Sequence, residues 1–232
     1  MSEILITGSS GVIGTVLCEG LQHHIRDFDL PEYDARAYDQ LRERMSGCRA
    51  VVHLAWNNSE DHYRSARTDP DNYQMAQNIF QAALETGVHR VIVASSIHAD
   101  MPSTYPKIPR SPYSLPEPDS PYGAAKVAIE ALGRYYTQHK ALGVIAVRFG
   151  WVSPNEADRP DQTKPYPLGE GWLSHGDCVD LVNSCPELPN IPNNYHILWG
   201  LSRRETSEVH DLNSQIWAPN DIYSAPLTHK KD

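Results

Sequence analysis

A tyrosine and a lysine four residues apart, in the segment Y-G-A-A-K from Tyr122 to Lys126, are the pair of side chains best suited to acid–base chemistry in this sequence. Residues four apart on a helix share one face, one turn from each other. A free phenol has a pKa of about 10, and a neighbouring ammonium favours its ionised form. The spacing therefore predicts that Tyr122 acts as a general base, supported by the charge of Lys126.

Polar side chains also follow the apolar run R-V-I-V-A, at Ser95, Ser96 and His98. A serine hydroxyl at the end of this strand can hold a substrate oxygen while Tyr122 removes its proton. For His98, contact with the substrate and a hydrogen bond within the loop are both open. Because a Tyr–Lys pair at this spacing occurs by chance on many surface helices, its interpretation depends on the elements that precede it.

Three glycines near the N-terminus, Gly8, Gly11 and Gly14, separate an apolar run from the apolar pattern of a helix. Gly8 permits a sharp turn, Gly11 lets the backbone approach a pyrophosphate, and Gly14 lets the helix pack against its strand. The helix N-terminus adds N–H donors and the positive end of its dipole. The spacing G-x-x-G-x-x-G is by itself a weak signal, but the strand before it and the helix after it favour a dinucleotide site over a glycine turn of some other α/β protein.

A carboxylate, Asp29, follows the next expected strand and stands fifteen residues beyond Gly14. In dinucleotide-binding folds an acid about 20 residues on accepts hydrogen bonds from the adenosine ribose. Its charge also repels a 2′-phosphate, so Asp29 predicts NAD rather than NADP as the cofactor. Capping of the turn before Pro31 is the alternative role for this side chain.

Apolar runs typical of buried parallel strands alternate with helical patterns as far as about residue 150. This alternation predicts an α/β, doubly wound parallel sheet of the Rossmann type. Strands are expected at Ile4–Ile6, His24–Phe28, Ala50–Leu54, Arg90–Ala94 and Gly143–Phe149, and helices from Val12 and at Asp39–Met45, Asp69–Thr86 and Pro121–His139. Glu32–Asp34 is short for a third strand, so that strand is either minimal or missing.

The part of the chain after residue 150 is rich in proline and less regular. A helix is expected at Gly176–Ser184, a strand at Tyr195–Trp199 and a helix-like piece from Thr206. Residues 1–150 are therefore predicted to form the NAD-binding core. Residues 151–232 are expected to form a small, loop-rich substrate region packed on that core as part of one structural unit.

The composition limits the partners and the compartment. The 232 residues carry a formal net charge of -9, which argues against nucleic acid or an anionic membrane as partner. No run is long enough for a membrane span and no leader pattern precedes the first strand, so a cytoplasmic protein is expected. The four cysteines are scattered and the eleven histidines lack ligand spacing, so we expect neither a disulfide framework nor a metal site.

Taken in order, the segments T-G-S-S-G-V-I-G, V-V-H-L-A-W, V-I-V-A-S-S, Y-G-A-A-K and V-R-F-G, with Asn72 on the helix between the second and third, resemble the extended short-chain dehydrogenases/reductases, the NAD-dependent epimerase/dehydratase group. The resemblance covers roughly residues 3–185. The segments S-S-I-H, R-F-G-W-V-S-P-N-E and W-L-S-H-G-D-C-V-D-L-V are similar to the uronate dehydrogenase branch. The resemblance implies a homodimer formed through the helices Asp69–Thr86 and Pro121–His139.

The resemblance also implies the residues of the site. The catalytic residues are expected to be Ser96, Tyr122 and Lys126, with Ser95 as a neighbour that orients the loop. Contacts with the cofactor NAD are expected from Gly8, Ser10, Gly11, Val12, Ile13, Gly14, Asp29, Leu30, Asp34, Leu54, Ala55, Trp56, Tyr122 and Lys126. Contacts with a sugar substrate are expected from Asn58, Ser96, His98, Tyr122 and Arg159.

Three positions depart from the uronate dehydrogenase pattern. Ile97 stands where that branch has asparagine, and Trp151 where it has a small hydroxyl residue. For the arginine that grips the sugar carboxylate, the nearest candidates are Arg159 and Lys164. These changes remove polar contacts and add bulk, while the residues for hydride transfer are retained.

The sequence thus predicts an NAD-dependent oxidoreductase that oxidises an aldose or sugar acid at C1 to a lactone. A nucleotide-sugar epimerase or dehydratase is one alternative, but such enzymes normally have a larger C-terminal region than the roughly eighty residues that follow the last clear strand of the core. A non-catalytic dinucleotide-sensing protein is another, and the joint presence of Ser96, Tyr122 and Lys126 argues against it.

Overall fold

The computed structural model describes residues 3–57, 67–100, 114–140, 142–156, 171–188, 192–204, 213, 216–220 and 222–223. Of the residues singled out above, Asn58, Arg159 and Lys164 lie outside these ranges, as does the start of the helix-like piece expected from Thr206.

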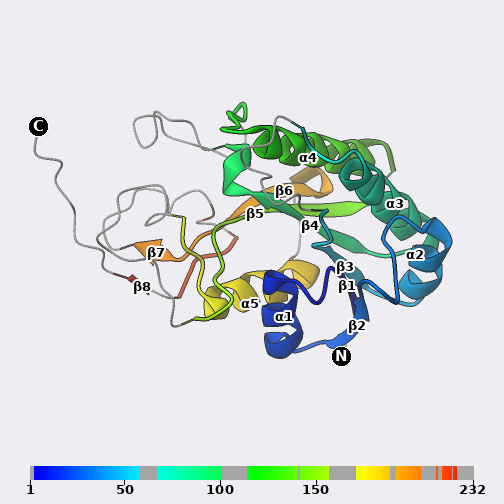
Figure 1. The fold of residues 1–232 in the computed structure, drawn as a ribbon, viewed down its shortest axis with the longest axis horizontal. Helices are drawn as coiled ribbons and strands as arrows, with labels where there is room; N and C mark the ends of the chain where they lie inside the picture. Colours follow the sequence, from blue (N-terminus) through cyan, green and yellow to red (C-terminus); the bar gives the residue numbers. More distant parts are fainter. Residues whose placement is uncertain are drawn as a thin grey trace, which may run out of the picture.

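Six strands of the described chain form one sheet in which every neighbouring pair is parallel. The order across the sheet is β2-β1-β3-β4-β5-β6, and Figure 1 shows it as the middle layer of the molecule. The strands are β1 Glu3–Thr7, β2 His24–Phe28, β3 Ala50–His53, β4 Arg90–Ser96, β5 Gly143–Phe149 and β6 Tyr195–Gly200. All residues of β3 and β5 are buried, as expected for the inner strands of a sheet covered on both faces.

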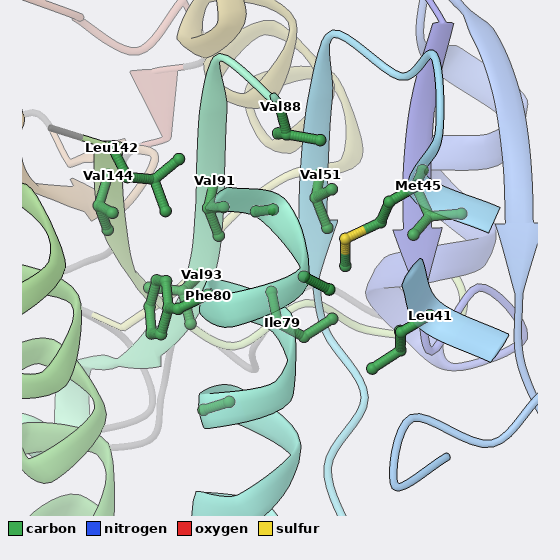
Figure 2. Close-up of a cluster of buried hydrophobic side chains, with 14 of the residues drawn as sticks. Leu41, Met45, Val51, Ile79, Phe80, Val88, Val91, Val93, Leu142 and Val144 are labelled. Carbon is green, nitrogen blue, oxygen red and sulfur yellow. The ribbon is translucent and has the colours of Figure 1, made fainter. Parts of the chain in front are cut away.

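Helices cover both faces of this sheet (Figure 1). On one face lie α1 Val12–Gly20 and α5 His175–Ser184, and on the other α2 Tyr38–Met45, α3 Asp71–Thr86 and α4 Pro121–Lys140. Each face buries its own apolar cluster. Figure 2 shows the cluster beneath α2 and α3, where Phe80 and Ile79 of α3 point at the valines of the inner strands. The doubly wound fold is confirmed, and none of the described helices is both long and apolar enough to cross a membrane.

No described strand follows β2 on the outer side of the sheet, because Glu32 lies in a turn, Tyr33 and Asp34 have no regular structure, and the chain then enters α2. Of the two possibilities for this segment, a minimal third strand or a missing one, the structure shows the second. From β2 the chain returns across β1 to form β3 on its other side. This reversal leaves a crevice between the carboxyl ends of β1 and β3, the position at which open α/β sheets bind their ligands.

Two elements, β4 and α3, differ by two residues from a predicted bound, and each does so for a local reason. β4 extends to Ser96 rather than ending at Ala94, because Ser95 and Ser96 pair with Arg148 and Phe149 of β5. α3 begins at Asp71 rather than Asp69, since the carboxylate of Asp69 accepts the backbone N–H of Asp71 before the helix starts. Both serines are thus held in the sheet and do not belong to a loop.

Beyond residue 150, α5 packs against α1 and β6 pairs with β5. These elements complete the layered core, while β7 Arg203–Arg204 and β8 Ile222–Tyr223 form a separate parallel pair. The division of the chain into a cofactor core and a substrate region at residue 150 stays a prediction.

Candidate active site

A cavity of about 650 Å³ opens at the carboxyl ends of the strands. Every residue predicted to contact the cofactor lines it, from Gly8 of the glycine turn to Lys126 of α4. Ser96 and His98 of the predicted substrate set line the same cavity. The structure therefore brings the two sets together at one site, although their contacts with ligands stay predictions.

The glycine turn is shaped by close backbone contacts. Gly8 has φ +71°, and a side chain there would place its Cβ 2.7 Å from the backbone nitrogen of Ala55. A Cβ on Gly14 would lie 2.2 Å from the carbonyl oxygen of Gly8. Gly11 is the N-cap of α1 and no side chain caps the first N–H groups of that helix. These donors border the cavity, so the turn fits a pyrophosphate.

Asp29 connects the end of β2 to the glycine turn. Its Oδ2 accepts hydrogen bonds from the backbone N–H and the hydroxyl of Ser10, at 2.8 and 2.5 Å, and its Oδ1 accepts the N–H of Leu30 at 2.9 Å. Each carboxylate oxygen has two lone pairs, so Asp29 retains acceptor capacity toward the cavity. Its local capping role is observed, and its role toward a ribose stays a prediction.

The same end of the cavity contains an ion pair that no sequence pattern predicted. Asp34 receives three hydrogen bonds of 2.7 to 3.0 Å from the guanidinium of Arg36, which also reaches Asp71 at 3.2 Å. The hydrogen bonds with Arg36 lower the pKa of Asp34. Beside them Tyr33 stacks on Phe28, with ring centroids 5.1 Å apart. Asp34, Arg36 and Tyr33 all line the cavity.

At the other end, Tyr122 stands in the first turn of α4. A Cβ on Gly123 would lie 2.0 Å from the carbonyl oxygen of His98, so this turn packs directly on the backbone after β4. As a result the Tyr122 ring lies 6.0 Å from that of His98 and 5.6 Å from that of Trp56, in edge-to-face geometry. Tyr122 and Ser96, the last residue of β4, line the same cavity.

Lys126 lies one helical turn beyond Tyr122 and is only 4 % exposed. Its Nζ donates to the carbonyl oxygen of Ala94 at 2.9 Å and faces the indole of Trp56 at 3.6 Å from the ring centroid. The same nitrogen lies 5.5 Å from the centre of the Tyr122 ring. Burial lowers the pKa of Lys126 to about 7, with Glu130 acting in the opposite direction. At 5.5 Å from the Tyr122 ring, the ammonium is close enough to favour the phenolate form of Tyr122.

The sequence of residues 4–166 matches the model of the NAD dependent epimerase/dehydratase family. The chain belongs to this family. The expected enzyme class and NAD as the cofactor are therefore confirmed. The chain is 29 % identical to L-arabinose 1-dehydrogenase (NAD(P)(+)) of Haloferax volcanii, with 95 % of this chain and 97 % of the relative covered.

Two further similarities bear on the fold and the family. NAD-dependent glucose-6-phosphate dehydrogenase of Haloferax volcanii is 29 % identical, covering 86 % of this chain and 84 % of the relative. A crystal structure of a uronate dehydrogenase variant from Agrobacterium tumefaciens complexed with NAD superposes with a TM-score of 0.75 at 24 % identity, over 96 % of this chain and 86 % of that one. The second similarity confirms the fold of this family member.

Glu130 extends the row of functional side chains on α4 by one more turn beyond Lys126. Its carboxylate accepts the hydroxyl of Ser95 at 2.5 Å and two hydrogen bonds from Arg148 at 2.8 and 2.9 Å. Arg148 also donates to Asp100 at 2.8 Å. Burial opposes the charge of Arg148, but the two carboxylates outweigh it and raise its pKa. The Tyr–Lys–Glu spacing along one helix face was the sequence signal for this residue.

Ser95 and Ser96 differ in their hydrogen-bond partners. The hydroxyl of Ser95 is buried against Glu130 and fastens β4 to α4, so it acts on the helix rather than on the loop. Ser96 Oγ accepts the backbone N–H of His98 at 3.3 Å and borders the cavity. Ser96 is therefore the hydroxyl of the pair that this family member can present to a substrate.

Two histidines near the cavity differ in their surroundings. His98 Nδ1 is 2.7 Å from Oδ2 of Asp119, so the loop hydrogen bond exists while the ring still borders the cavity. His53 is buried in β3 with its Nδ1 2.7 Å from Thr7 Oγ1, and burial, then Lys126, lowers its pKa to about 3. No cluster suited to a metal ion occurs within the described ranges.

The buried ammonium leads to a prediction about stability. In the unfolded chain Lys126 has an ordinary lysine pKa of about 10.4. Between pH 7 and 10 the unfolded chain therefore holds a proton that the folded protein has lost. Because the unfolded state binds more protons in this range, the stability of the wild type rises with pH. Below pH 7 the folded protein carries the full cost of the buried charge. Lys126→Met is therefore expected to be about 2 kcal/mol more stable than the wild type at pH 6.5, and the difference should close by pH 9.5.

Urea unfolding at the two pH values measures this difference. Arg134→Met, which removes a cation from an exposed position of the same helix, serves as the control and should leave stability nearly unchanged. A difference between Lys126→Met and the wild type that is equal at pH 6.5 and 9.5 would contradict the assignment of the charge.

Proposed function

We propose that this protein is an NAD-dependent dehydrogenase that oxidises a sugar or sugar acid at C1 to a lactone. The observation that carries the proposal is the meeting of Ser96, Tyr122 and Lys126 at one end of a cavity whose other end is the glycine turn. The relative named L-arabinose 1-dehydrogenase supports carbon 1 as the reacting position. Residues 151–232 are proposed to supply the rest of the substrate site.

In this proposal the chain's own residues manage the proton and the orientation of the sugar. Ser96 holds the C1 hydroxyl, and Tyr122, as phenolate, takes its proton while the C1 hydrogen leaves as hydride. Lys126, held by Ala94 and Trp56, stabilises the negative charge on Tyr122 before the transfer. NAD, when bound along the glycine turn, supplies the hydride acceptor. The sugar loses two hydrogens in all and its ring stays closed as a lactone.

A test of this mechanism is the formation of NADH from NAD with a panel of aldoses, uronates and sugar phosphates. Tyr122→Phe is expected to lower kcat at least 10³-fold, since it removes the only acid–base group of the phenol, while leaving binding of NAD unchanged by calorimetry. Tyr136→Phe, on the same helix but in the core, is the matched control. Equal activity of Tyr122→Phe and the wild type would refute the proposed base.

The same assay separates the alternatives. A nucleotide-sugar epimerase uses NAD without net turnover, so absorbance at about 340 nm would stay flat with every free sugar and an epimerised nucleotide sugar would appear instead. A non-catalytic dinucleotide-binding protein would bind NAD but give neither product. Steady accumulation of NADH from a free sugar supports the dehydrogenase.

We propose that Asp29 sets the preference for NAD over NADP. Asp29→Asn keeps an oxygen that accepts the N–H of Ser10 and removes the negative charge that repels a 2′-phosphate. The ratio of kcat/KM for NAD to that for NADP is expected to fall at least tenfold. An unchanged ratio, with an intact fold by circular dichroism, would show that a group other than Asp29 discriminates between NAD and NADP.

We further propose a homodimer formed through α3 and α4. Each helix presents a tyrosine that is largely exposed, Tyr73 at 42 % and Tyr135 at 47 %, and an exposed aromatic on a helix face is suited to a protein interface. Light scattering is expected to give twice the chain mass of 26.0 kDa, and Tyr135→Glu is expected to give the single mass. A wild type that is monomeric at 100 µM or more would exclude this interface.

A further inference from the structure

Trp151 places an exposed indole at the catalytic end of the cavity. In the sheet, Ser96 of β4 is the register partner of Phe149 of β5, and Trp151 follows Phe149 by two residues. Strands β4 and β5 thus end at the same edge of the sheet, and Ser96 and Trp151 line the same cavity. The indole is 42 % exposed, so one of its surfaces is available to a ligand.

The backbone and the ring of Trp151 are both held in place. Its N–H donates to the carbonyl oxygen of Gly171 at 2.5 Å, and its carbonyl oxygen accepts the N–H of Leu173 at 3.0 Å. The indole packs edge-on against Trp172, with centroids 5.3 Å apart, and Trp172 is itself 2 % exposed. A rigid, exposed aromatic ring inside a ligand cavity loses little conformational entropy when it is covered.

The charged groups near this end are already engaged within the part of the chain that the structure describes. The ammonium of Lys126 has the Ala94 carbonyl and the Trp56 ring. The ring of His98 faces the carboxylate of Asp119, which would repel an anionic substrate. A carboxylate or phosphate placed against the Trp151 indole would therefore lose water without gaining the Lys126 ammonium in its place.

We propose that Trp151 is a stacking platform for the sugar ring, and that the substrate is an uncharged aldose rather than a uronate or a sugar phosphate. This inference rests on the proposed function and names its substrate class. One face of an aldose ring presents C–H groups, which pack on the indole, while the hydroxyls at the edge of the ring face Ser96 and His98. Trp151 is thus a specificity-determining residue of this site.

The test compares Trp151→Leu, which keeps apolar bulk without the flat ring, with Trp151→Phe, which keeps an aromatic face. Steady-state kinetics are measured with L-arabinose, D-glucose, D-glucuronate and glucose 6-phosphate. For the wild type we expect kcat/KM to be at least tenfold higher for a neutral aldose than for either anion. Trp151→Leu should raise the aldose KM at least tenfold with the KM for NAD within twofold, and Trp151→Phe should raise it threefold or less.

Tyr33→Leu is the matched control, because Tyr33 is an aromatic residue of the same cavity at the end of β2, beyond the glycine turn. It should leave the aldose KM within twofold. If it raises the aldose KM as much as Trp151→Leu does, the effect is general loosening and the stacking role is refuted. A wild-type preference for the uronate or the phosphate also refutes the proposal, while production of NADH from these anions leaves the dehydrogenase assignment intact.

A binding measurement makes the test independent of turnover. In Tyr122→Phe saturated with NAD, saturation-transfer NMR should show strong transfer to the ring C–H protons of the aldose, and this transfer should be lost in the double variant Tyr122→Phe/Trp151→Leu. If no sugar yields NADH but this transfer is observed, the proposed reaction fails and the sugar platform stands. If transfer is the same in both variants, or absent from both, the platform is refuted.

Discussion

A buried ammonium is the constraint on which the site depends. In the proposed mechanism Lys126 has to keep its charge beside Tyr122 with almost no contact with water, which is costly. The structure offsets that cost with the Ala94 carbonyl, the face of the Trp56 indole and the nearby carboxylate of Glu130. Burial nevertheless outweighs these partners, since it lowers the pKa of Lys126 to about 7.

This requirement explains why α4 is fastened to the sheet along its length. Near Tyr122 the helix touches the backbone of His98 through Gly123. At Lys126 it is bonded to Ala94 of β4, and at Glu130 to Ser95 of β4 and Arg148 of β5. A helix held at three successive turns keeps the phenol and the ammonium in a fixed relation, as a preorganised site requires.

The cavity follows from the topology of the sheet. The reversal at β1 opens a crevice that starts at the glycine turn and continues across the ends of β3, β4 and β5. On the β2 side, where the third strand is missing, a loop containing Tyr33 and the Asp34–Arg36 pair forms the wall. On the β5 side, Trp151 forms the wall. A core of Rossmann type thus ends in two walls, one after β2 and one after β5.

The sequence by itself determined the features that depend on local backbone geometry and on periodicity. Turns that exclude a Cβ required the glycines at positions 8 and 14, buried strands required apolar runs, and helical spacing placed Tyr122 and Lys126 on one face. From these followed the parallel sheet, with strand and helix ends correct to within about two residues. The family came from the resemblance of whole segments, and the catalytic roles of Ser96, Tyr122 and Lys126 stay predictions.

Only the tertiary structure decided which distant residues meet. The indole of Trp56 covers Lys126 seventy positions later, His98 faces Asp119, and Trp172 supports Trp151. Such pairs have no spacing rule, because they are brought together by the crossovers of the sheet and not by the period of one element. The charge state of the lysine and the shape of the substrate wall are therefore properties of the folded chain, since both depend on the exclusion of water by residues remote in sequence.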